Sequence, residues 1–405
     1  MDTVCHVITK LELGGAQEVA LYTISHLDRR KFRPVLVTGP GGLLTEEASR
    51  VPHLDVIVLP NLVRQISPLR DLATLLSLVR LFRRLRPAIV HTHSSKAGIL
   101  GRWAAWLART PIIVHTIHGY GVTPQQSPWL QRWMIRLERA TGLVTSQWVA
   151  VSQADITKGR EWGLFGSNVD LIRPGIDPIP FQVPVDPAKR EALRREFGAG
   201  PSHRLVGTVA CLKPQKAPED FVAVAKRVCA ADSAARFVLI GDGELRGRIE
   251  QLLRQEQLTD RVYLAGWRRD VPAVMQAIDL FLLTSHWEGL PRVLLEARAG
   301  GLPIVSTKAG GSEEALEGSP VQQLCPPGDV EGLAAGVLRL LTPRPGPPAA
   351  VSGPSSAFPK EFRIDDMLSG YAELYGRLLA ACMPFQTVRS SPKPAQSGPR
   401  VPFNT

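Results

Sequence analysis

Short runs of β-branched and aliphatic residues alternate with longer amphipathic stretches along both halves of the chain. This alternation is typical of parallel sheets whose strands are joined by crossover helices. In the first half it predicts strands at 4–9, 34–38, 55–59, 88–91, 112–115 and 148–152, and helices at 16–27, 68–85, 96–108, 129–141 and 153–162. In the second half it predicts strands at 205–210, 236–240, 262–265, 280–284 and 303–306. We therefore expect two doubly wound, Rossmann-like α/β domains.

A proline-rich stretch separates the two halves. Pro174, Gly175, Pro178 and Pro180 prevent a continuous helix or central strand. The sequence therefore predicts an N-terminal domain over 1–175, a linker over 176–188 and a C-terminal domain over 189–361. Apolar residues at helical spacing predict a C-terminal helix over 362–383, followed by a flexible tail over 384–405. Ligands of such sheets bind beyond the carboxyl ends of the strands, so we expect the site in a cleft between the domains.

Composition excludes several classes of protein. With 44% hydrophobic and 21% charged residues, the chain can bury a sizeable core and is not expected to be disordered. No apolar run approaches the roughly 18 to 20 residues of a membrane span, and the first residues lack the basic region of a signal peptide, so we expect a cytoplasmic protein. Five scattered cysteines without a Cys-x-x-Cys pair argue against disulfides and zinc sites.

The chain is basic, with a formal net charge of +11, and most of the excess lies in the first half. Residues 1–177 hold 21 Lys and Arg against 13 Asp and Glu. This asymmetry favours an anionic partner, such as nucleic acid, anionic lipid or a phosphorylated acceptor. We find no nucleic-acid-binding module, so nucleic acid is not expected.

The segment 127–139 combines Trp129 and Trp133 with Arg132, Arg136 and Arg139 at helix-like spacing. Such helices dock in the headgroup region of anionic membranes, and four arginines at 80–86 form a second basic cluster. The segment therefore predicts peripheral docking on the inner face of the cell membrane. The alternative is an ordinary helix whose two tryptophans pack on the sheet.

Two turns of the first half carry candidate chemistry. Gly14 and Gly15 join the first strand to the first helix, where backbone N–H groups favour an anionic ligand, although a structural tight turn is an equal alternative. His118 follows the strand at 112–115 and so is expected beside the cleft, with a buried core histidine as the alternative. His91 and His93 are left unassigned.

The second half adds two glutamates and a lysine. Glu288 and Glu296 are eight residues apart, in a loop and the helix that follows it. Eight helical residues cover about 12 Å, beyond the roughly 5 to 9.5 Å between the carboxylates of glycoside hydrolases. The two glutamates are therefore expected to bind different parts of one extended ligand. Lys216, in the loop after the strand at 205–210, is placed to neutralise a phosphate, unless it is an ordinary exposed lysine.

Several segments together resemble glycosyltransferase family 4, the group 1 glycosyltransferases of the type that builds bacterial surface polysaccharides. The resemblance runs from about residue 4 to residue 379, and its most specific part is the spacing of Glu288 and Glu296. It also rests on LGGAQ at 13–17, HTHSSKAG at 91–98, DLFLLTS at 279–285, EGLP at 288–291, AGG at 309–311 and PPGD at 326–329.

The resemblance implies the two-domain glycosyltransferase B fold. It further implies transfer of a sugar from a nucleotide diphosphate sugar to a glycan or lipid-linked acceptor, a hexosyltransferase-type reaction with retained anomeric configuration. No cofactor and no metal at the diphosphate are implied.

Each candidate residue takes a role from the resemblance. Lys216 would hold the diphosphate and Glu296 the ribose hydroxyls. Glu288 and the backbone N–H groups of Gly289 and Leu290 would face the donor sugar and phosphate. Gly15 would let the backbone of the first domain approach the diphosphate, and His118 would contact the donor sugar near the reacting carbon.

One departure from the family pattern matters. The family has an arginine after the strand that precedes Lys216, whereas this chain has Cys211. Loss of a charge-assisted contact to the diphosphate would cost about 2 to 4 kcal/mol, and Lys213 is the nearest substitute. The alternative function is a catalytically silent homologue that binds a nucleotide sugar or assembles a biosynthetic complex.

Overall fold

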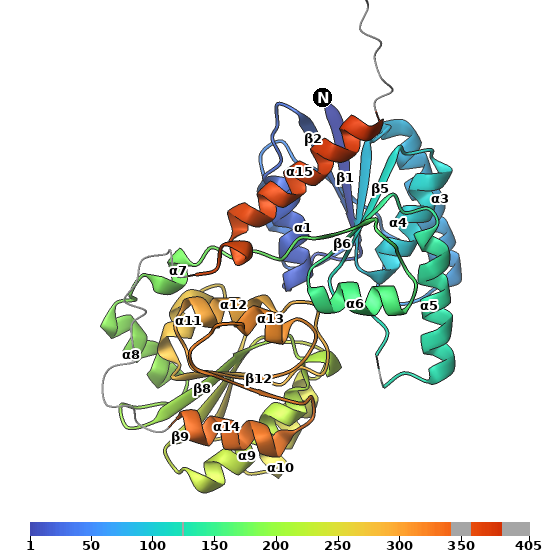
Figure 1. Cartoon of the computed structure of the whole chain (residues 1–405). Helices are drawn as coiled ribbons and strands as arrows, with labels where there is room; N and C mark the ends of the chain where they lie inside the picture. The colour runs from blue at the N-terminus through green and yellow to red at the C-terminus, as the bar shows by residue number, and fades with distance from the viewer. Residues whose placement is uncertain (124, 342–357, 383–405) are drawn as a thin grey trace, which may run out of the picture.

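The computed structural model describes residues 1–123, 125–341 and 358–382. Its strands form two separate parallel sheets, one in each half of the chain (Figure 1). The first sheet has seven strands in the order β3-β2-β1-β4-β5-β6-β7. In chain order they are β1 (Asp2–Ile8), β2 (Phe32–Thr38), β3 (Asp55–Val58), β4 (Ile89–His93), β5 (Ile112–Ile117), β6 (Gln147–Ala150) and β7 (Val169–Leu171).

Helices cover both faces of this sheet. Strand β1 shows how, because Val4 and Ile8 join one apolar cluster while Cys5 and Val7 join another on the opposite face. The first cluster includes residues of α1 and α2, and the second includes residues of α3 and α4. The helices are α1 (Gly15–Ser25), α2 (Thr45–Arg50), α3 (Pro68–Leu85), α4 (Ser95–Leu107), α5 (Pro128–Gly142) and α6 (Gln153–Glu161).

The second sheet has six strands in the order β10-β9-β8-β11-β12-β13. They are β8 (Arg204–Val209), β9 (Ala235–Ile240), β10 (Val262–Gly266), β11 (Leu280–Leu283), β12 (Ile304–Thr307) and β13 (Gln322–Cys325). Its helices are α9 (Pro218–Ala231), α10 (Arg246–Gln255), α11 (Val271–Ala277), α12 (Arg292–Ala299), α13 (Ser312–Leu316) and α14 (Val330–Leu340). One cluster packs α9, α10 and α14 on one face, and another packs α11, α12 and α13 on the other.

The last helix returns to the first sheet. After the short helices α7 (Ile179–Gln182) and α8 (Pro187–Glu196) the chain builds the second sheet, and a single turn of 3-10 helix (Lys360–Phe362) then leads into α15 (Ile364–Cys382). Met367, Tyr371, Leu374 and Tyr375 of α15 are buried against β1, β4 and β5 (Figure 1). Backbone hydrogen bonds between Ile176 and the segment 362–364 tie the two crossing chain segments together.

Sequence reasoning anticipated most of these elements. Each predicted strand is present, with ends within two residues of the prediction. Two short strands were missed: β7, which has only three residues, and β13, which begins Gln322-Gln323 and lacks an apolar run. Helix α8 begins inside the predicted linker and packs on α11, and α15 occupies most of the predicted C-terminal helix. The predicted tail at 384–405 lies outside the described residues. None of the described helices has the length and apolar character needed to cross a membrane.

Candidate active site

The carboxyl ends of β8 and β11 bring Lys216 and Glu288 together. The Lys216 ammonium forms an ion pair with the Glu288 carboxylate, whose side chain is only 7% exposed. Gln215 Nε2 donates to the other carboxylate oxygen at 3.3 Å. This pairing places a cation and an oriented carboxylate in one small volume, so the two residues that the sequence singled out separately form one unit.

The turn that carries Lys216 is fixed by the loop after β11. The Thr284 hydroxyl donates to the carbonyl oxygens of Lys216 and Ala217, each at 3.0 Å, and the His286 N–H donates to the Gln215 carbonyl at 2.8 Å. Ala217 has φ +44°, a left-handed conformation that these bonds hold in place. The lysine is therefore presented by a rigid turn.

The two domains touch backbone to backbone at Gly289. A Cβ atom built on Gly289 would lie 2.6 Å from the carbonyl carbon of His118 and 2.7 Å from the Gly119 nitrogen. No side chain fits such an approach. The sequence motif Ala309-Gly310-Gly311 supports the same loop, because the Gly311 N–H donates to the Gly289 carbonyl at 2.6 Å. Leu290 turns its side chain into the core, so only its backbone can face a ligand.

Glu296 lies on α12, one turn beyond Arg292. Burial raises the pKa of its carboxyl to about 7, only partly opposed by the Arg292 charge, and Glu18 raises it further. Among the residues that the structure describes, no hydrogen bond or ion pair holds this carboxylate. Glu296 is thus available to accept from a ligand, and it changes protonation near neutral pH.

Arg292 is a residue of this site that sequence reasoning missed. Its guanidinium pairs with Glu18 of α1, in the other domain, and its Nε is buried without a hydrogen-bond partner in the described structure. A Cβ atom on Gly15 would lie 3.6 Å from Arg292 Cδ. The glycine turn and the arginine are therefore adjacent, and the position of Arg292 four residues before Glu296 was the available signal.

Cys211 is half-buried, and burial raises the pKa of its thiol. Lys213, the candidate substitute for the missing arginine, pairs through Nζ with Glu12 of the first domain at 3.2 Å. Glu12 also contacts Lys10 at 3.2 Å, and these cations hold the pKa of its carboxyl below the usual range. Lys213 is thus placed at the cleft but is already engaged by a carboxylate.

A cavity of about 460 Å³ opens between the domains. Its lining includes Ser94, Ser95 and His118 from the first domain with Lys213 and Gln215 from the second. Lys216, Glu288 and Glu296 are not part of that lining. The cavity therefore lies beside the lysine–glutamate pair, on the side of His118.

Buried histidines extend from His118 into the first domain. His93 Nδ1 lies 3.1 Å from His118 Nε2, and His93 Nε2 lies 3.1 Å from His6 Nδ1. Nitrogen atoms of His6, His91 and His93 lie within 4.8 Å of one another, a spacing at which metal binding must be considered. All six of these ring nitrogens already have hydrogen-bond partners, however, so the described geometry is that of a hydrogen-bond chain.

Comparison with known proteins decides the family. Residues 13–179 match the family described as Glycosyltransferase Family 4, and residues 203–343 match the family described as Glycosyl transferases group 1. An Escherichia coli relative named as UDP-Gal:alpha-D-GlcNAc-diphosphoundecaprenol alpha-1,3-galactosyltransferase is 31% identical over 315 residues, which cover 76% of this chain and 80% of the relative. The chain belongs to glycosyltransferase family 4. The N-acetyl-alpha-D-glucosaminyl L-malate synthase of Bacillus anthracis is 27% identical over 76% of the chain and 79% of its own length.

Solved structures confirm the glycosyltransferase B fold. Anabaena HepE, determined in complex with UDP and glucose, superposes with a TM-score of 0.78 at 22% identity and covers 93% of this chain and 100% of its own. Sucrose-phosphate synthase from Thermosynechococcus elongatus gives a TM-score of 0.75 at 21% identity, covering 94% and 100%. The candidate site residues of this family 4 glycosyltransferase lie in loops at the carboxyl ends of strands and in the helices that follow.

Proposed function

We propose that this glycosyltransferase moves a hexose from a uridine diphosphate sugar to a lipid-linked acceptor in surface polysaccharide synthesis, with retention of anomeric configuration. The observation that carries the proposal is the Lys216–Glu288 pair, held at the point where the His118–Gly119 loop of the other domain touches Gly289. The named activity of the E. coli relative supports a UDP-sugar donor and a lipid-linked acceptor.

In the donor complex Lys216 stabilises the charge that develops on the departing diphosphate. Glu288 orients the sugar, because its carboxylate is tied to Lys216 and Gln215 and is thereby fixed in direction. Glu296 accepts from the ribose hydroxyls. In this proposal the cations that hold the diphosphate come from the chain itself, without a cofactor or metal.

Arg292 provides the charge that the family draws from an arginine at the position of Cys211. The Arg292 side chain lies against Gly15, and within the described structure its buried Nε–H has no hydrogen-bond partner. Before the donor binds, the Glu18 carboxylate pairs with the Arg292 guanidinium. The diphosphate of the donor also presents anionic oxygens and carries more negative charge, so it can take the place of Glu18. Two cations, Lys216 and Arg292, then face the leaving group.

Retention follows if the sugar is attacked from the face that the diphosphate leaves. A double displacement needs a free nucleophilic carboxylate at the anomeric carbon. Glu288 is unsuited to that role because Lys216 and Gln215 already engage both of its oxygens. Proton NMR of the product, started from an α-linked donor, tests this point: an α-linked product supports retention, and a β-linked product refutes it.

The donor assignment is tested by presenting the protein with UDP-, GDP- and ADP-sugars. We expect UDP and UDP-sugars alone to raise the melting temperature, and UDP release to follow with a GlcNAc-diphospho-lipid acceptor. If the wild type binds a UDP-sugar but releases no UDP when the acceptor is soluble, the result would instead support the catalytically silent alternative raised by Cys211. A preference for GDP- or ADP-sugars would overturn the uridine assignment.

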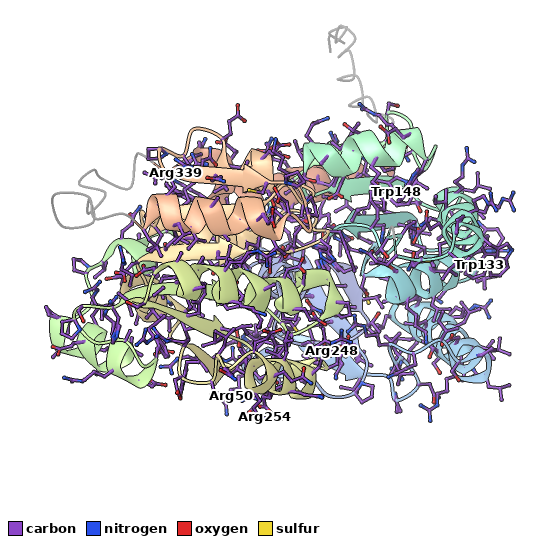
Figure 2. All side chains as sticks on the ribbon, turned by 90° about the horizontal axis from the view of Figure 1, so that it is seen from below. Arg50, Trp133, Trp148, Arg248, Arg254 and Arg339 are labelled. Carbon is purple, nitrogen blue, oxygen red and sulfur yellow. The ribbon has the colours of Figure 1, made fainter. Side chains whose placement is uncertain are left out.

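The surface of α5 supports a membrane-bound acceptor. Trp129 is 68% exposed and Trp133 is 47% exposed, so the expectation that they pack on the sheet is wrong. Figure 2 shows Trp133 at the outer edge of the molecule, away from the second domain. Arg132, Arg136 and Arg139 lie on the same exposed side of the helix. On neighbouring α4, Trp106 and Leu107 are also exposed.

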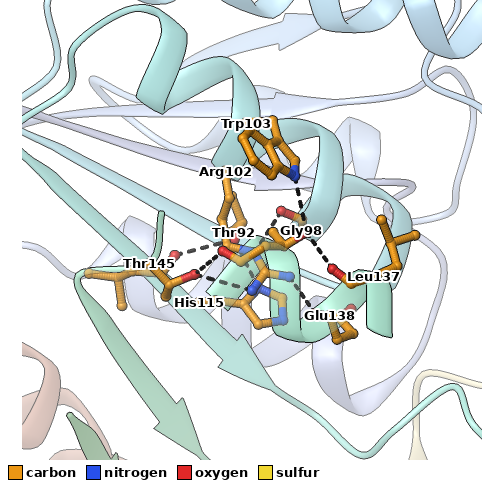
Figure 3. Close-up of polar contacts among 10 residues, drawn as sticks. Thr92, Gly98, Arg102, Trp103, His115, Leu137, Glu138 and Thr145 are labelled. Atoms are coloured by element: carbon orange, nitrogen blue, oxygen red, sulfur yellow. Dashed lines mark hydrogen bonds and ion pairs between the residues drawn. The ribbon is translucent and has the colours of Figure 1, made fainter. Parts of the chain in front are cut away.

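A buried ion pair holds α5 to the domain. Arg102 of α4 is fully buried and donates to the Glu138 carboxylate of α5 at 2.7 Å and to the Thr145 hydroxyl at 3.3 Å (Figure 3). Trp103 Nε1 adds a bond to the Thr141 hydroxyl at 3.1 Å. Because Glu138 is neutralised inside the protein, the exposed charges of α5 are its arginines. The helix is therefore a fixed basic and aromatic surface.

Liposome co-sedimentation tests docking. We expect binding to phosphatidylglycerol vesicles that weakens with salt and falls on charge reversal of Arg132, Arg136 and Arg139, since each basic residue near an anionic surface contributes about 1 kcal/mol. The matched control reverses Arg227 of α9 with Arg248 and Arg254 of α10, all exposed residues of the second domain. Figure 2 labels Arg248 and Arg254. Equal loss in both variants, or equal recovery with neutral and anionic vesicles, would refute docking through α5.

A further inference from the structure

The histidines of the first domain share one face of its sheet. Because side chains alternate along a strand, His91 and His93 of β4 point to the same side, and His6 of β1 is paired in register with His91. Helix α15, whose Tyr375 is fully buried, covers this face together with α1 and α2. His6, His91 and His93 are each 0% exposed, whereas His118 is partly exposed at the cavity.

Hydrogen bonds join these rings in one line, here called the histidine chain. From the cavity it runs from His118 Nε2 to His93 Nδ1, and from His93 Nε2 to His6 Nδ1. His6 Nε2 then meets the Tyr375 hydroxyl at 2.8 Å, and that hydroxyl meets His91 Nδ1 at 2.5 Å. His91 Nε2 ends the chain at the Thr116 hydroxyl, 2.7 Å away.

The rings are neutral at neutral pH. Burial lowers the pKa of His6 to about 3 and that of His118 to about 4, and it lowers those of His91 and His93 as well. A neutral imidazole has one N–H and one acceptor nitrogen. Each contact along the chain therefore holds a single proton, which must belong to one ring or the other.

Two proton arrangements satisfy every contact and also give the Tyr375 O–H an acceptor. If the Tyr375 hydroxyl donates to His6, all four rings carry their proton on Nδ1, and His118 presents an N–H to the cavity. If that hydroxyl donates to His91, all four rings carry their proton on Nε2, and His118 presents a bare acceptor nitrogen. Every other arrangement leaves two lone pairs or two protons facing each other, or leaves the Tyr375 O–H without an acceptor, and each of these is costly in a buried site.

We propose that Tyr375 is a positioning residue of the donor site, and that its hydroxyl fixes the tautomer of His118 through His93 and His6. The inference rests on the proposed function, because it assigns His118 to the sugar donor. The proposal links α15 to the His118 ring nitrogen that faces the cavity, because it determines whether that nitrogen donates or accepts a hydrogen bond. Substrate contact by His118 then depends on a residue that itself touches no ligand.

The test compares Tyr375→Phe with Tyr371→Phe. Both tyrosines are buried on α15 one turn apart, but the one hydrogen bond of the Tyr371 hydroxyl within the described structure is to Thr116, at 3.4 Å, at the end of the chain farthest from His118. Long-range ¹⁵N–¹H correlation of histidine-labelled protein reports which ring nitrogen carries the proton, with no substrate present. In the wild type and in Tyr371→Phe we expect one common tautomer for His118, His93 and His6, and in Tyr375→Phe a changed or mixed tautomer of His118.

Activity provides the second measurement. With UDP-galactose, Tyr375→Phe is expected to lower kcat about tenfold with little change in KM, the effect of one lost hydrogen bond to the reacting sugar. In a His118→Ala background the same substitution should have no further effect. If the wild type turns over no UDP-sugar, the donor proposal fails, while the NMR measurement still decides the histidine chain.

Opposite tautomers for His118 and His93 in the wild type would overturn the proposal. So would an equal effect of Tyr375→Phe and Tyr371→Phe, or an undiminished effect of Tyr375→Phe without His118, since either would indicate a purely structural role. If Tyr375→Phe does not fold, His93→Phe breaks the chain elsewhere while retaining an aromatic ring. It must then change the His118 tautomer, and an unchanged tautomer refutes the inference.

Discussion

Replacing Lys216 by methionine isolates the contribution of one cation to sugar transfer. Methionine keeps an unbranched side chain on the turn that Thr284 and His286 hold, but it removes the charge. Loss of one preorganised donor to a leaving group costs about 2.7 to 4 kcal/mol, so kcat should fall by roughly 10² to 10³. KM for the donor should change less, because the charge on the diphosphate grows in the transition state.

The substitution also acts on Glu288. Without Lys216, a side chain that is 7% exposed keeps only the Gln215 amide, at 3.3 Å, of its two partners. An incompletely paired buried charge is costly, so we expect the variant to lose the fixed orientation of the Glu288 carboxylate as well as the cation.

Lys213→Met is the matched control. Both lysine side chains are 20% exposed and they lie three residues apart, but Lys213 pairs with Glu12 of the other domain. A pair at this exposure contributes about 0 to 1 kcal/mol, so kcat should fall by less than tenfold. Initial rates of UDP release with UDP-galactose measure both variants. A Lys216→Met enzyme within threefold of the wild type refutes its role, and a larger loss in Lys213→Met would show that Lys213 replaces the missing arginine.

Four further substitutions test other parts of the site and its scaffold. An ionised Glu296 accepts more strongly from ribose hydroxyls, so UDP affinity should rise up to about tenfold between pH 6 and 8. Glu296→Gln should remove that pH dependence. The variant is needed to assign the dependence to Glu296, because burial also raises the pKa of Asp155 to about 7. Cys211→Arg should raise kcat or leave it nearly unchanged, and a folded but inactive variant would give Cys211 another role. Arg102→Met should lower the free energy of unfolding by about 3 to 5 kcal/mol in denaturant titrations, and adding Glu138→Leu should restore most of that loss. If the double variant instead loses the sum of the two single-variant losses in unfolding free energy, the buried ion pair is contradicted.

The fold was largely predictable because its signals are local. A buried parallel strand is a continuous apolar run, and each crossover helix has an apolar stripe, so periodicity alone locates them. Strands β7 and β13 escaped because edge strands bury less and carry polar residues such as Asp170 and Gln322. The packing of α15 on the first sheet was also out of reach, since its apolar face does not specify which domain covers it.

The candidate site divides along the same line. Lys216, Glu288 and Glu296 stand out because their spacing within one domain is set by short loops. Arg292 and Lys213 gain their meaning from Glu18 and Glu12, carboxylates about 200 or more positions away in the chain. No local pattern reports such pairs, because each is created only when the domains meet.

The histidines make the same point more sharply. Taken one at a time, His6, His91 and His93 are indistinguishable from buried core residues, and in the fold each is indeed fully buried. Their chemistry lies in the order of the strands, because β1, β4 and β5 are neighbours and place alternating positions on one face. Once α15 adds the Tyr375 hydroxyl to that face, the hydrogen bonds between the neutral rings all run in the same donor-to-acceptor direction. A fold can thus couple an active-site nitrogen to a distant helix without any charged residue between them.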